Sequence, residues 1–113
     1  MTIEEFEDRI TAFETFDLEF KSAKGGIPGS FWETYSSFAN TQGGEIFLGV
    51  KQTKEGLVID GLSKEQALSY QKQLWDCLNN RNKVSVNLLG NDDIERIDTM
   101  LGCVLAIRIP MAD

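Results

Sequence analysis

The chain has 113 residues, of which 42% are hydrophobic, enough for one folded domain with its own core. Its formal net charge is −7 and it contains no histidine, which excludes a histidine-assisted nucleophile and a Cys/His zinc site within the chain. No apolar run approaches the ~20 residues that a membrane-spanning helix requires. The two cysteines form no CxxC pair, and we therefore predict a cytoplasmic protein with reduced thiols and no membrane association.

The negative charge is concentrated near the N-terminus. Residues 1–19 carry seven acidic side chains and one arginine, and hence −6 of the total charge of −7. The rest of the chain is close to neutral. A duplex-binding domain is more often basic, so this balance disfavours strong non-specific binding of nucleic acid while leaving room for a local basic patch.

The first third of the chain predicts a helix, a strand and a loop. Thr2 and Glu5 have the spacing of a capping box, and apolar side chains follow at helical intervals, which predicts a helix over residues 3–13. Residues 16–21 alternate between apolar and charged side chains, a pattern typical of a half-buried strand. The glycine-rich segment 24–29 predicts a loop.

The rest of the chain is organised around residues 38–50, which read F-A-N-T-Q-G-G-E-I-F-L-G-V. Ser30 and Glu33 repeat the capping-box spacing and predict the start of a second helix, whose aromatic side chains we assign mainly to the core. The end of this helix, the hinge and the buried strand follow one another with no additional residues between them. The hinge contains two glycines. Asn40 and Gly43 can adopt the left-handed conformation that often ends a helix. A connection that is tight only because the packing is tight explains the hinge equally well.

The second half predicts a hairpin, a third helix and a meander. Residues 51–56 predict a polar hairpin loop and residues 57–59 the strand after it. Ser63 and Gln66 form a third capping-box pattern before a helix over residues 64–79. The inward side chains of this helix are expected to be Ala67, Leu68, Leu74, Trp75 and Leu78. Three further strands are predicted over residues 84–88, 94–100 and 103–109.

This order of elements indicates an α/β (α+β) fold, with a mixed sheet of about six strands and two to three helices packed largely on one face. We expect residues 1–113 to form a single domain. We also expect this domain to be the N-terminal fragment of a longer protein, because nothing in the sequence caps the end of the last strand.

Charged residues around the first strand could carry metal-dependent chemistry. Glu19 and Lys21 project to one side of the strand, with Asp17 beside them, and Glu14 precedes it. Carboxylates gathered there would hold Mg²⁺ or Mn²⁺, and the lysine would stabilise charge during phosphodiester cleavage. Because an E-x-K pair arises on any amphipathic strand, a solvated ion pair is the stronger interpretation. Outside this alternative we assign no catalytic residue, metal or cofactor.

A second set of residues surrounds the hinge. If the strand after the hinge lies beside the strand over residues 16–21, four lysines would border one edge of the sheet and meet phosphate groups. Scattered surface lysines are the alternative. The chain has no G-x-x-x-x-G-K-[ST] motif, so the hinge is not a P-loop. The predicted nucleic-acid-binding residues are Lys21, Lys24, Asn40, Gln42, Gly43, Gly44, Lys51 and Lys54.

With these motifs in view, the chain resembles the Schlafen AlbA-type domain family, also called the AlbA-2 domain. The resemblance covers about residues 14–110. It implies an Alba-like two-layer α/β sandwich at the N-terminus of larger bacterial proteins, which are described as transcriptional regulators or helicase-related proteins that bind DNA. The motifs that carry it are Glu14, L-E-F-K at 18–21, S-S-F-A-N-T-Q-G-G-E-I-F-L-G-V at 36–50, G-L-V-I-D-G-L at 56–62 and A-I-R-I-P at 106–110.

Some animal relatives are similar in this domain but cut transfer and ribosomal RNA. Their acidic triad has two glutamates placed like Glu14 and Glu19, and an aspartate just after the G-V that ends the second strand. Here Lys51 follows that G-V, so the third carboxylate is missing at this place, and Asp60 would replace it only if the strands bring it near. The departure argues against nuclease activity, whereas a lysine there suits a phosphate contact.

The leading prediction is therefore a nucleic-acid-binding domain of a bacterial transcriptional regulator, with DNA as its partner and no enzymatic activity. Two alternatives stay open. One is a metal-dependent endoribonuclease of the Schlafen type, which would use Mg²⁺ or Mn²⁺. The other is a protein-interaction or homodimerisation module, which the acidic first helix suggests.

Overall fold

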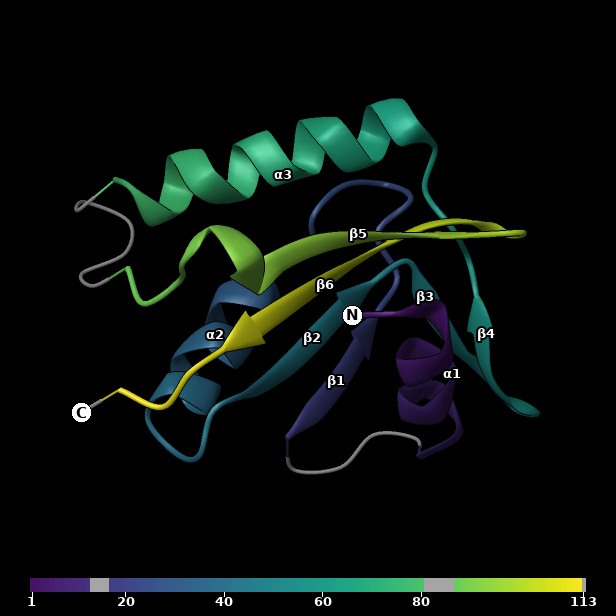
Figure 1. Cartoon of the computed structure of the whole chain (residues 1–113), viewed down its shortest axis with the longest axis horizontal. Helices are drawn as coiled ribbons and strands as arrows, with labels where there is room; N and C mark the ends of the chain where they lie inside the picture. The colour runs from purple at the N-terminus through teal and green to yellow at the C-terminus, as the bar shows by residue number, and fades with distance from the viewer. Residues whose placement is uncertain (13–16, 81–86, 113) are drawn as a thin grey trace.

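The structure, a computed structural model, describes residues 1–12, 17–80 and 87–112. These ranges contain three α-helices, a short 3₁₀ helix and six strands (Figure 1). The predicted mixed α+β fold is confirmed. The six strands are divided between a four-stranded sheet of order β1-β2-β6-β5 and a separate β3–β4 hairpin.

The elements follow one another in an order close to the predicted one. They are α1 (Ile3–Ala12), β1 (Leu18–Lys21), α2 (Phe31–Ala39), β2 (Gly44–Leu48), β3 (Val50–Thr53), β4 (Gly56–Ile59), α3 (Lys64–Leu78), η1 (Asn91–Asp93), β5 (Ile94–Thr99) and β6 (Gly102–Ile109). No helix in the described part of the chain is both long and apolar enough to span a membrane.

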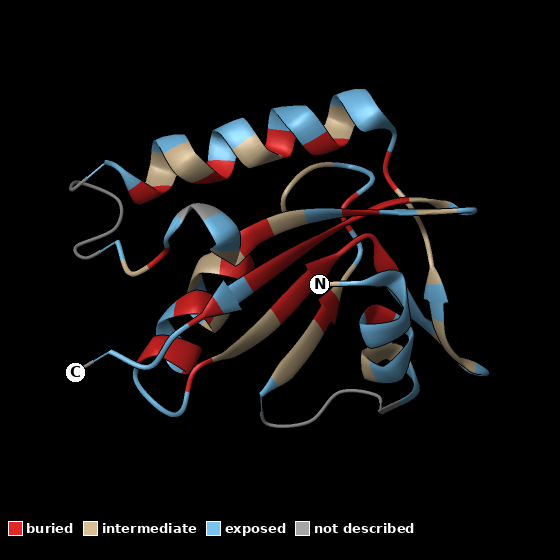
Figure 2. Cartoon of the chain, viewed as in Figure 1, coloured by how far each residue is buried: buried red, intermediate tan, exposed pale blue. Residues whose placement is uncertain are grey.

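The main sheet is mixed because β1 runs parallel to β2, whereas β6 is antiparallel to both of its neighbours. Helix α2 connects β1 to β2, which is the usual way to join two parallel strands. β2 and β6 lie in the middle of the sheet, and most of their residues are buried (Figure 2).

Two apolar clusters cover the opposite faces of this sheet. On one face, α2 and α3 pack against side chains that include Ile46, Leu48, Leu105 and Ile107. On the other, α1 and the β3–β4 hairpin pack against Phe47, Val104 and Ala106. The alternation along β2 and β6 thus supplies both faces with apolar side chains. Two of the three helices share one face, and α1 lies on the other.

α1 docks through one aromatic side chain. Phe6 is fully buried, with its ring centroid 5.5 Å from that of Phe47. The ring of Phe20 stacks on that of Phe47, with the two centroids 5.2 Å apart. Figure 2 shows that much of the rest of α1 faces solvent, so Phe6, with the partly buried Ile10 beside the same cluster, connects an acidic, exposed helix to the core.

Two of the three predicted capping boxes are present. The N–H of Glu5 donates to the Thr2 hydroxyl at 3.1 Å, and the N–H of Thr2 donates to the Glu5 carboxylate at 3.3 Å. This contact with Thr2 lowers the pKa of Glu5 below its ordinary value. Ser63 and Gln66 exchange the same two bonds at 3.1 Å each.

The capping box predicted at Ser30 and Glu33 is wrong. Ser30 has helical angles of φ −71° and ψ −7°, and its side chain makes no capping bond. Its hydroxyl instead accepts a hydrogen bond from the Lys21 ammonium at 3.0 Å. The hydroxyl thus makes a tertiary contact and no local capping bond.

The predicted strand that continues to Val50 is divided in two. Gly49 has a φ of +108°, and the chain leaves the main sheet there, so Val50 begins β3 in the hairpin. A Cβ at Gly49 would lie 3.0 Å from the carbonyl oxygen of Cys103, which leaves little room for a side chain. Residues 51–53, predicted as loop, belong to β3.

Two predictions in the second half need correction or fall outside the structure. Leu68, predicted to face inward on α3, is 58% exposed. The strand predicted over residues 84–88 lies mostly outside the described residues, and Leu88 is not in a strand. The last two predicted strands are confirmed as the β5–β6 hairpin.

Candidate functional site

The structure confirms that the two strands of the predicted site are neighbours, but it separates the hinge from the lysines. In the parallel pair, Leu18 lies opposite Glu45 and Lys21 lies opposite Leu48. The hinge therefore meets the start of β1, where the N–H of Glu45 donates to the Asp17 carbonyl at 2.9 Å. Lys21 is four residues further along β1, about 13 Å of extended chain. The hinge and the lysines consequently do not form one rim.

The two hinge glycines are required by packing. Gly43 has a φ of +79°, and a Cβ there would lie 2.6 Å from the carbonyl oxygen of Ile109. A Cβ at Gly44 would lie 2.6 Å from the ring of Phe38. Asn40, expected to adopt a left-handed conformation, keeps helical angles with φ −86°. These contacts favour the interpretation of the hinge as a tight connection.

Asn40 and Gln42 are exposed, and both lie at the hinge end of the sheet. The backbone of the hinge is engaged within the fold, since the N–H of Gly43 donates to the Phe38 carbonyl at 2.7 Å. Any ligand at this end would thus meet two amide side chains and no lysine of the predicted set.

The four predicted lysines, in contrast, lie on the β3–β4 hairpin or at its base. The N–H of Gly49, just before β3, donates to the carbonyl of Lys21 at 2.9 Å. Lys24 reaches the hairpin from the following loop, with its ammonium 3.1 Å from the carboxylate of Asp60, one residue past β4. Lys51 and Lys54 belong to the hairpin itself.

Lys21 and Lys24 are held by partners. The Lys21 ammonium lies 3.3 Å from the Glu19 carboxylate, and its side chain is only 11% exposed. The loop that carries Lys24 is fixed to α3, because Tyr70 donates to the Ala23 carbonyl at 2.8 Å and Gln66 donates to the Lys24 carbonyl at 3.1 Å. These two cations are therefore positioned and partly neutralised.

Lys51 and Lys54 are exposed, and neither forms an ion pair with another residue that the structure describes. Lys51 lies opposite Val58 on the outer face of the hairpin, while the neighbouring Val50 is fully buried. The turn beyond Lys51 is closed by the Thr53 hydroxyl, which donates to the Gly56 carbonyl at 2.8 Å. The hairpin thus presents two unneutralised ammonium groups on an ordered ribbon that extends from the main sheet (Figure 1).

The carboxylates of the nuclease alternative are only partly described. Glu14 lies outside the described residues. Asp60 does approach the end of β1, where its carboxylate accepts from the Ser22 hydroxyl at 3.5 Å and pairs with Lys24. Within the described ranges, no three His, Cys, Asp or Glu side chains are placed to hold a metal ion.

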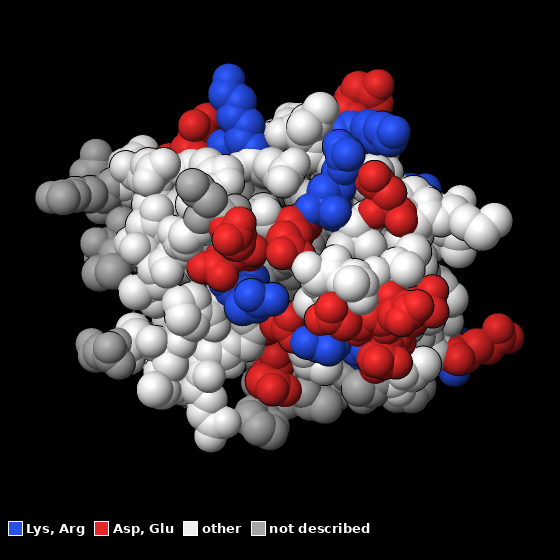
Figure 3. Space-filling model, viewed as in Figure 1, with Lys and Arg blue, Asp and Glu red and all other residues white. Residues whose placement is uncertain are grey.

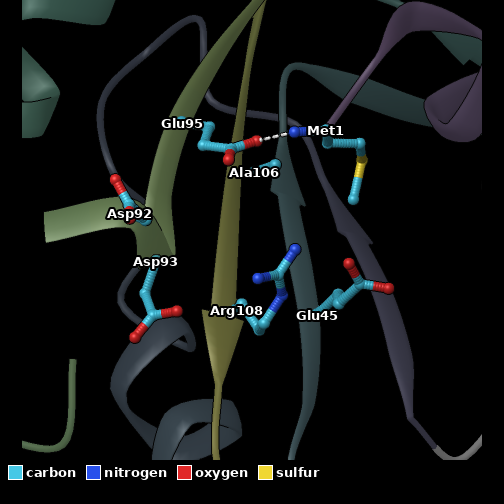
Figure 4. Close-up of a pocket in the computed structure, with 7 residues that line it drawn as sticks. All are labelled: Met1, Glu45, Asp92, Asp93, Glu95, Ala106 and Arg108. Atoms are coloured by element: carbon cyan, nitrogen blue, oxygen red, sulfur yellow. Dashed lines mark hydrogen bonds and ion pairs between the residues drawn. The ribbon is translucent and has the colours of Figure 1, made fainter. Parts of the chain in front are cut away.

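The sequence did not indicate a small polar hollow that lies on β6 beside Met1 (Figure 4). Arg108 is at its centre, opposite Glu45 in the β2–β6 register. Glu45 accepts a hydrogen bond from Arg9 at 3.0 Å, and Glu95 pairs with the Met1 amine. Asp92 and Asp93 complete the lining. With four carboxylates around one guanidinium and the Met1 amine, this hollow is unsuited to a phosphate group.

Acidic and basic side chains are unevenly distributed over the surface. On the face seen in Figure 3, acidic side chains gather over α1, and the basic side chains are interspersed with acidic ones. For the polar hollow, the alternation of apolar and polar residues along β6 predicts that Arg108 faces solvent. Only the β2–β6 register shows that Glu45 lies opposite it.

A four-stranded mixed sheet with helices on both faces and a projecting hairpin defines a small α+β domain built on a strand–helix–strand unit. The sequence model of the family described as Schlafen, AlbA_2 matches residues 14–113. The chain therefore belongs to the Schlafen AlbA_2 family, as the sequence motifs predict.

A solved structure shares this fold. It is the solution NMR structure of the N-terminal domain of a protein from Nitrosomonas europaea that is related to the ATP-dependent DNA helicase RecG. The two chains are 22% identical with a TM-score of 0.72, and the match covers 100% of the present chain and 75% of the other. No curated protein matches the chain.

Proposed function

We propose that the chain is a DNA-binding module of a transcriptional regulator, and that the β3–β4 hairpin is its contact surface. The observation that carries this proposal is the pair of unneutralised lysines, Lys51 and Lys54, on an exposed two-stranded ribbon. A two-stranded β-ribbon fits the major groove of B-DNA, and several DNA-binding proteins use one. Family membership and the fold shared with a domain of a RecG-related protein support the same direction.

In this arrangement, Lys51 and Lys54 contact phosphate oxygens directly. Lys24, at 60% exposure, adds a third contact from the base of the hairpin when a phosphate competes for its ammonium with Asp60. Lys21 is too enclosed by Glu19 and Ser30 to act as a free cation, and we assign it to holding the base of the hairpin. Phosphate contacts position a protein on the duplex, whereas they do not read its sequence.

The small number of cations sets the strength of this interaction. Two to three phosphate contacts predict that the logarithm of the binding constant falls with the logarithm of salt concentration with a slope of about −2 to −3. Because the chain carries a net charge of −7, we expect weak binding by the isolated domain that is detectable only at low salt.

Fluorescence anisotropy with a labelled duplex at low salt tests the proposal. The double variant Lys51→Glu/Lys54→Glu should weaken binding by about tenfold or more. The matched control is Lys64→Glu/Lys72→Glu on α3, which changes the net charge equally at two exposed positions away from the hairpin. It should stay within about twofold of the unaltered chain if the contact is local.

Two results would overturn the proposal. One is the absence of binding by the unaltered chain to any duplex or single strand at low salt. The other is an equal loss in the hairpin variant and in the α3 variant, which would show that only net charge matters.

A further inference from the structure

A hollow of about 210 Å³ opens between α1, the end of β4 and the turn between β5 and β6. Figure 1 shows these three segments at the same end of the molecule. Its wall is mainly apolar and includes Ile59 from the inner face of β4. Ile3 on one side is 42% exposed, and Met100 and Leu101 on the other are 102% and 66% exposed. Large apolar side chains that border a hollow together are typical of an interaction surface.

The turn that carries Met100 and Leu101 is held in place by the fold. The Thr99 hydroxyl donates to the Gly102 carbonyl at 2.6 Å and accepts from the N–H of Leu101 at 3.1 Å. Just beyond it, Cys103 and Leu62 exchange two backbone hydrogen bonds of 2.8 Å each. The two exposed side chains are therefore presented by a fixed backbone, which reduces the entropy lost when a partner binds.

The α1 side of the hollow is acidic. Glu7 lines it directly, one helical turn after Ile3, and Glu4 and Asp8 are exposed on the same helix. None of these three carboxylates forms an ion pair with a residue in the described ranges. The nearby Arg9 is already engaged with Glu45. An apolar hollow with an unneutralised acidic border complements a partner that is apolar on one side and basic beside it.

We infer that this hollow is a docking site for a basic amphipathic helix of a partner protein. The partner's apolar side chains enter between Ile3 and Met100, and its lysines or arginines face the acidic border of α1. A helix laid in a groove uses apolar anchors at intervals of three and four residues, and methionine adapts its shape to different anchors.

The same charges disfavour two other occupants. A two-fold dimer through this hollow would bring the acidic α1 helices of both copies into one interface, where like charges repel. An anionic lipid surface would be repelled by the same helix. The inference does not depend on DNA binding, because the two sites use different faces of the hairpin. Lys51 lies on its outer face, whereas Ile59 lines the hollow from its inner face.

Titration of the full chain with a labelled synthetic peptide tests the inference. The probe is a leucine–lysine peptide of about 18 residues with all leucines on one helical face. We expect saturable binding, NMR shift changes at Ile3, Ile59 and Leu101, and weaker binding at 0.5 M salt because the acidic border is exposed. The double variant Met100→Ser/Leu101→Ser should lose about tenfold in affinity. Leu68→Ser on α3, which alters an exposed leucine elsewhere, should leave the affinity unchanged.

Four outcomes would overturn the inference. The first is equal binding of a scrambled peptide with the same composition. The second is a pattern of shift changes that avoids the hollow. The third is a dimer in light scattering that the Met100→Ser/Leu101→Ser variant dissociates, since the hollow would then serve self-association. The fourth is co-sedimentation with anionic phosphatidylglycerol vesicles that the same variant abolishes.

Discussion

Gly44 shows most clearly how a single residue sets the geometry at the centre of this fold. It is the second hinge glycine and the first residue of β2, and both the ring of Phe38 and the backbone of Asp17 lie close to it. An added Cβ would lie 2.6 Å from the ring and 2.9 Å from the Asp17 carbonyl oxygen. Both distances are shorter than van der Waals contact, so either α2 or β1 would have to move.

We therefore expect Gly44→Ala to lower the free energy of unfolding by about 1–3 kcal/mol, the usual cost of overpacking a core. Urea denaturation measures this change. Gly29→Ala is the control, because no heavy atom lies within 4 Å of its added Cβ, and it should change the free energy of unfolding by less than about 0.5 kcal/mol. Equal effects of the two substitutions would contradict the packing explanation of the hinge.

Residue-level reasoning also shows what local sequence can and cannot predict. The capping boxes at Thr2 and Ser63 depend only on neighbours within one turn of helix, and both are present. At Ser30 the same pattern fails because the backbone keeps helical angles, whereas a capping residue is usually extended. The hydroxyl instead binds the Lys21 ammonium, nine residues away in sequence. Similarly, the break at Gly49 reflects the close approach of the β6 backbone, which the residues around Gly49 do not reveal.

At the scale of elements, the separation of the hinge from the lysines follows from the direction of β1. A helix between two neighbouring strands favours parallel pairing, and parallel pairing places the start of β2 beside the start of β1. The predicted strand–helix–strand order therefore contained the information that the hinge would lie beside Asp17. The sequence did place Lys51 and Lys54 in a hairpin, but the separation of this hairpin from the main sheet was not predictable in this way, because it depends on the exit of the chain at Gly49.

α1 docks on the sheet mainly through one aromatic side chain. Phe6 is its fully buried side chain, against Phe47. We expect Phe6→Ala to lower the free energy of unfolding by about 3–5 kcal/mol, because it removes a buried aromatic ring and leaves a cavity. Ile3→Ala, on the same helix but 42% exposed, should cost less than about 1 kcal/mol.

Chemical denaturation followed by far-UV circular dichroism measures both α1 variants. A small effect of Phe6→Ala would mean that α1 contributes little to the stability of the sheet. The face formed by Phe47, Val104 and Ala106 would then need another cover, and the assignment of α1 to the core would be wrong.

At the scale of the whole molecule, acidic and basic side chains serve different surfaces. α1 and the β3–β4 hairpin pack in the same apolar cluster, so the negative charge of α1 lies on the same side of the sheet as the hairpin lysines. α2 and α3 lie on the opposite face of the sheet. Acidic residues of α1 should therefore weaken DNA binding at the hairpin and strengthen binding of a basic partner at the apolar hollow beside α1. Both effects can be measured in one protein.

Neutralising the acidic border by Glu4→Gln, Glu7→Gln and Asp8→Asn should strengthen DNA binding by about two- to fivefold at low salt. The same triple variant should weaken binding of the leucine–lysine peptide. The matched control, Glu33→Gln, Glu65→Gln and Asp76→Asn, makes the same change in net charge on α2 and α3, and it should alter both affinities less. Because screening removes the long-range term, the gain in DNA affinity should disappear at 0.5 M salt. If both ligands bound more tightly to the α1 variant, the apolar hollow would not be a site for a basic partner. If the α1 and control variants had the same affinities, only the net charge of the chain would matter and not the position of the charges.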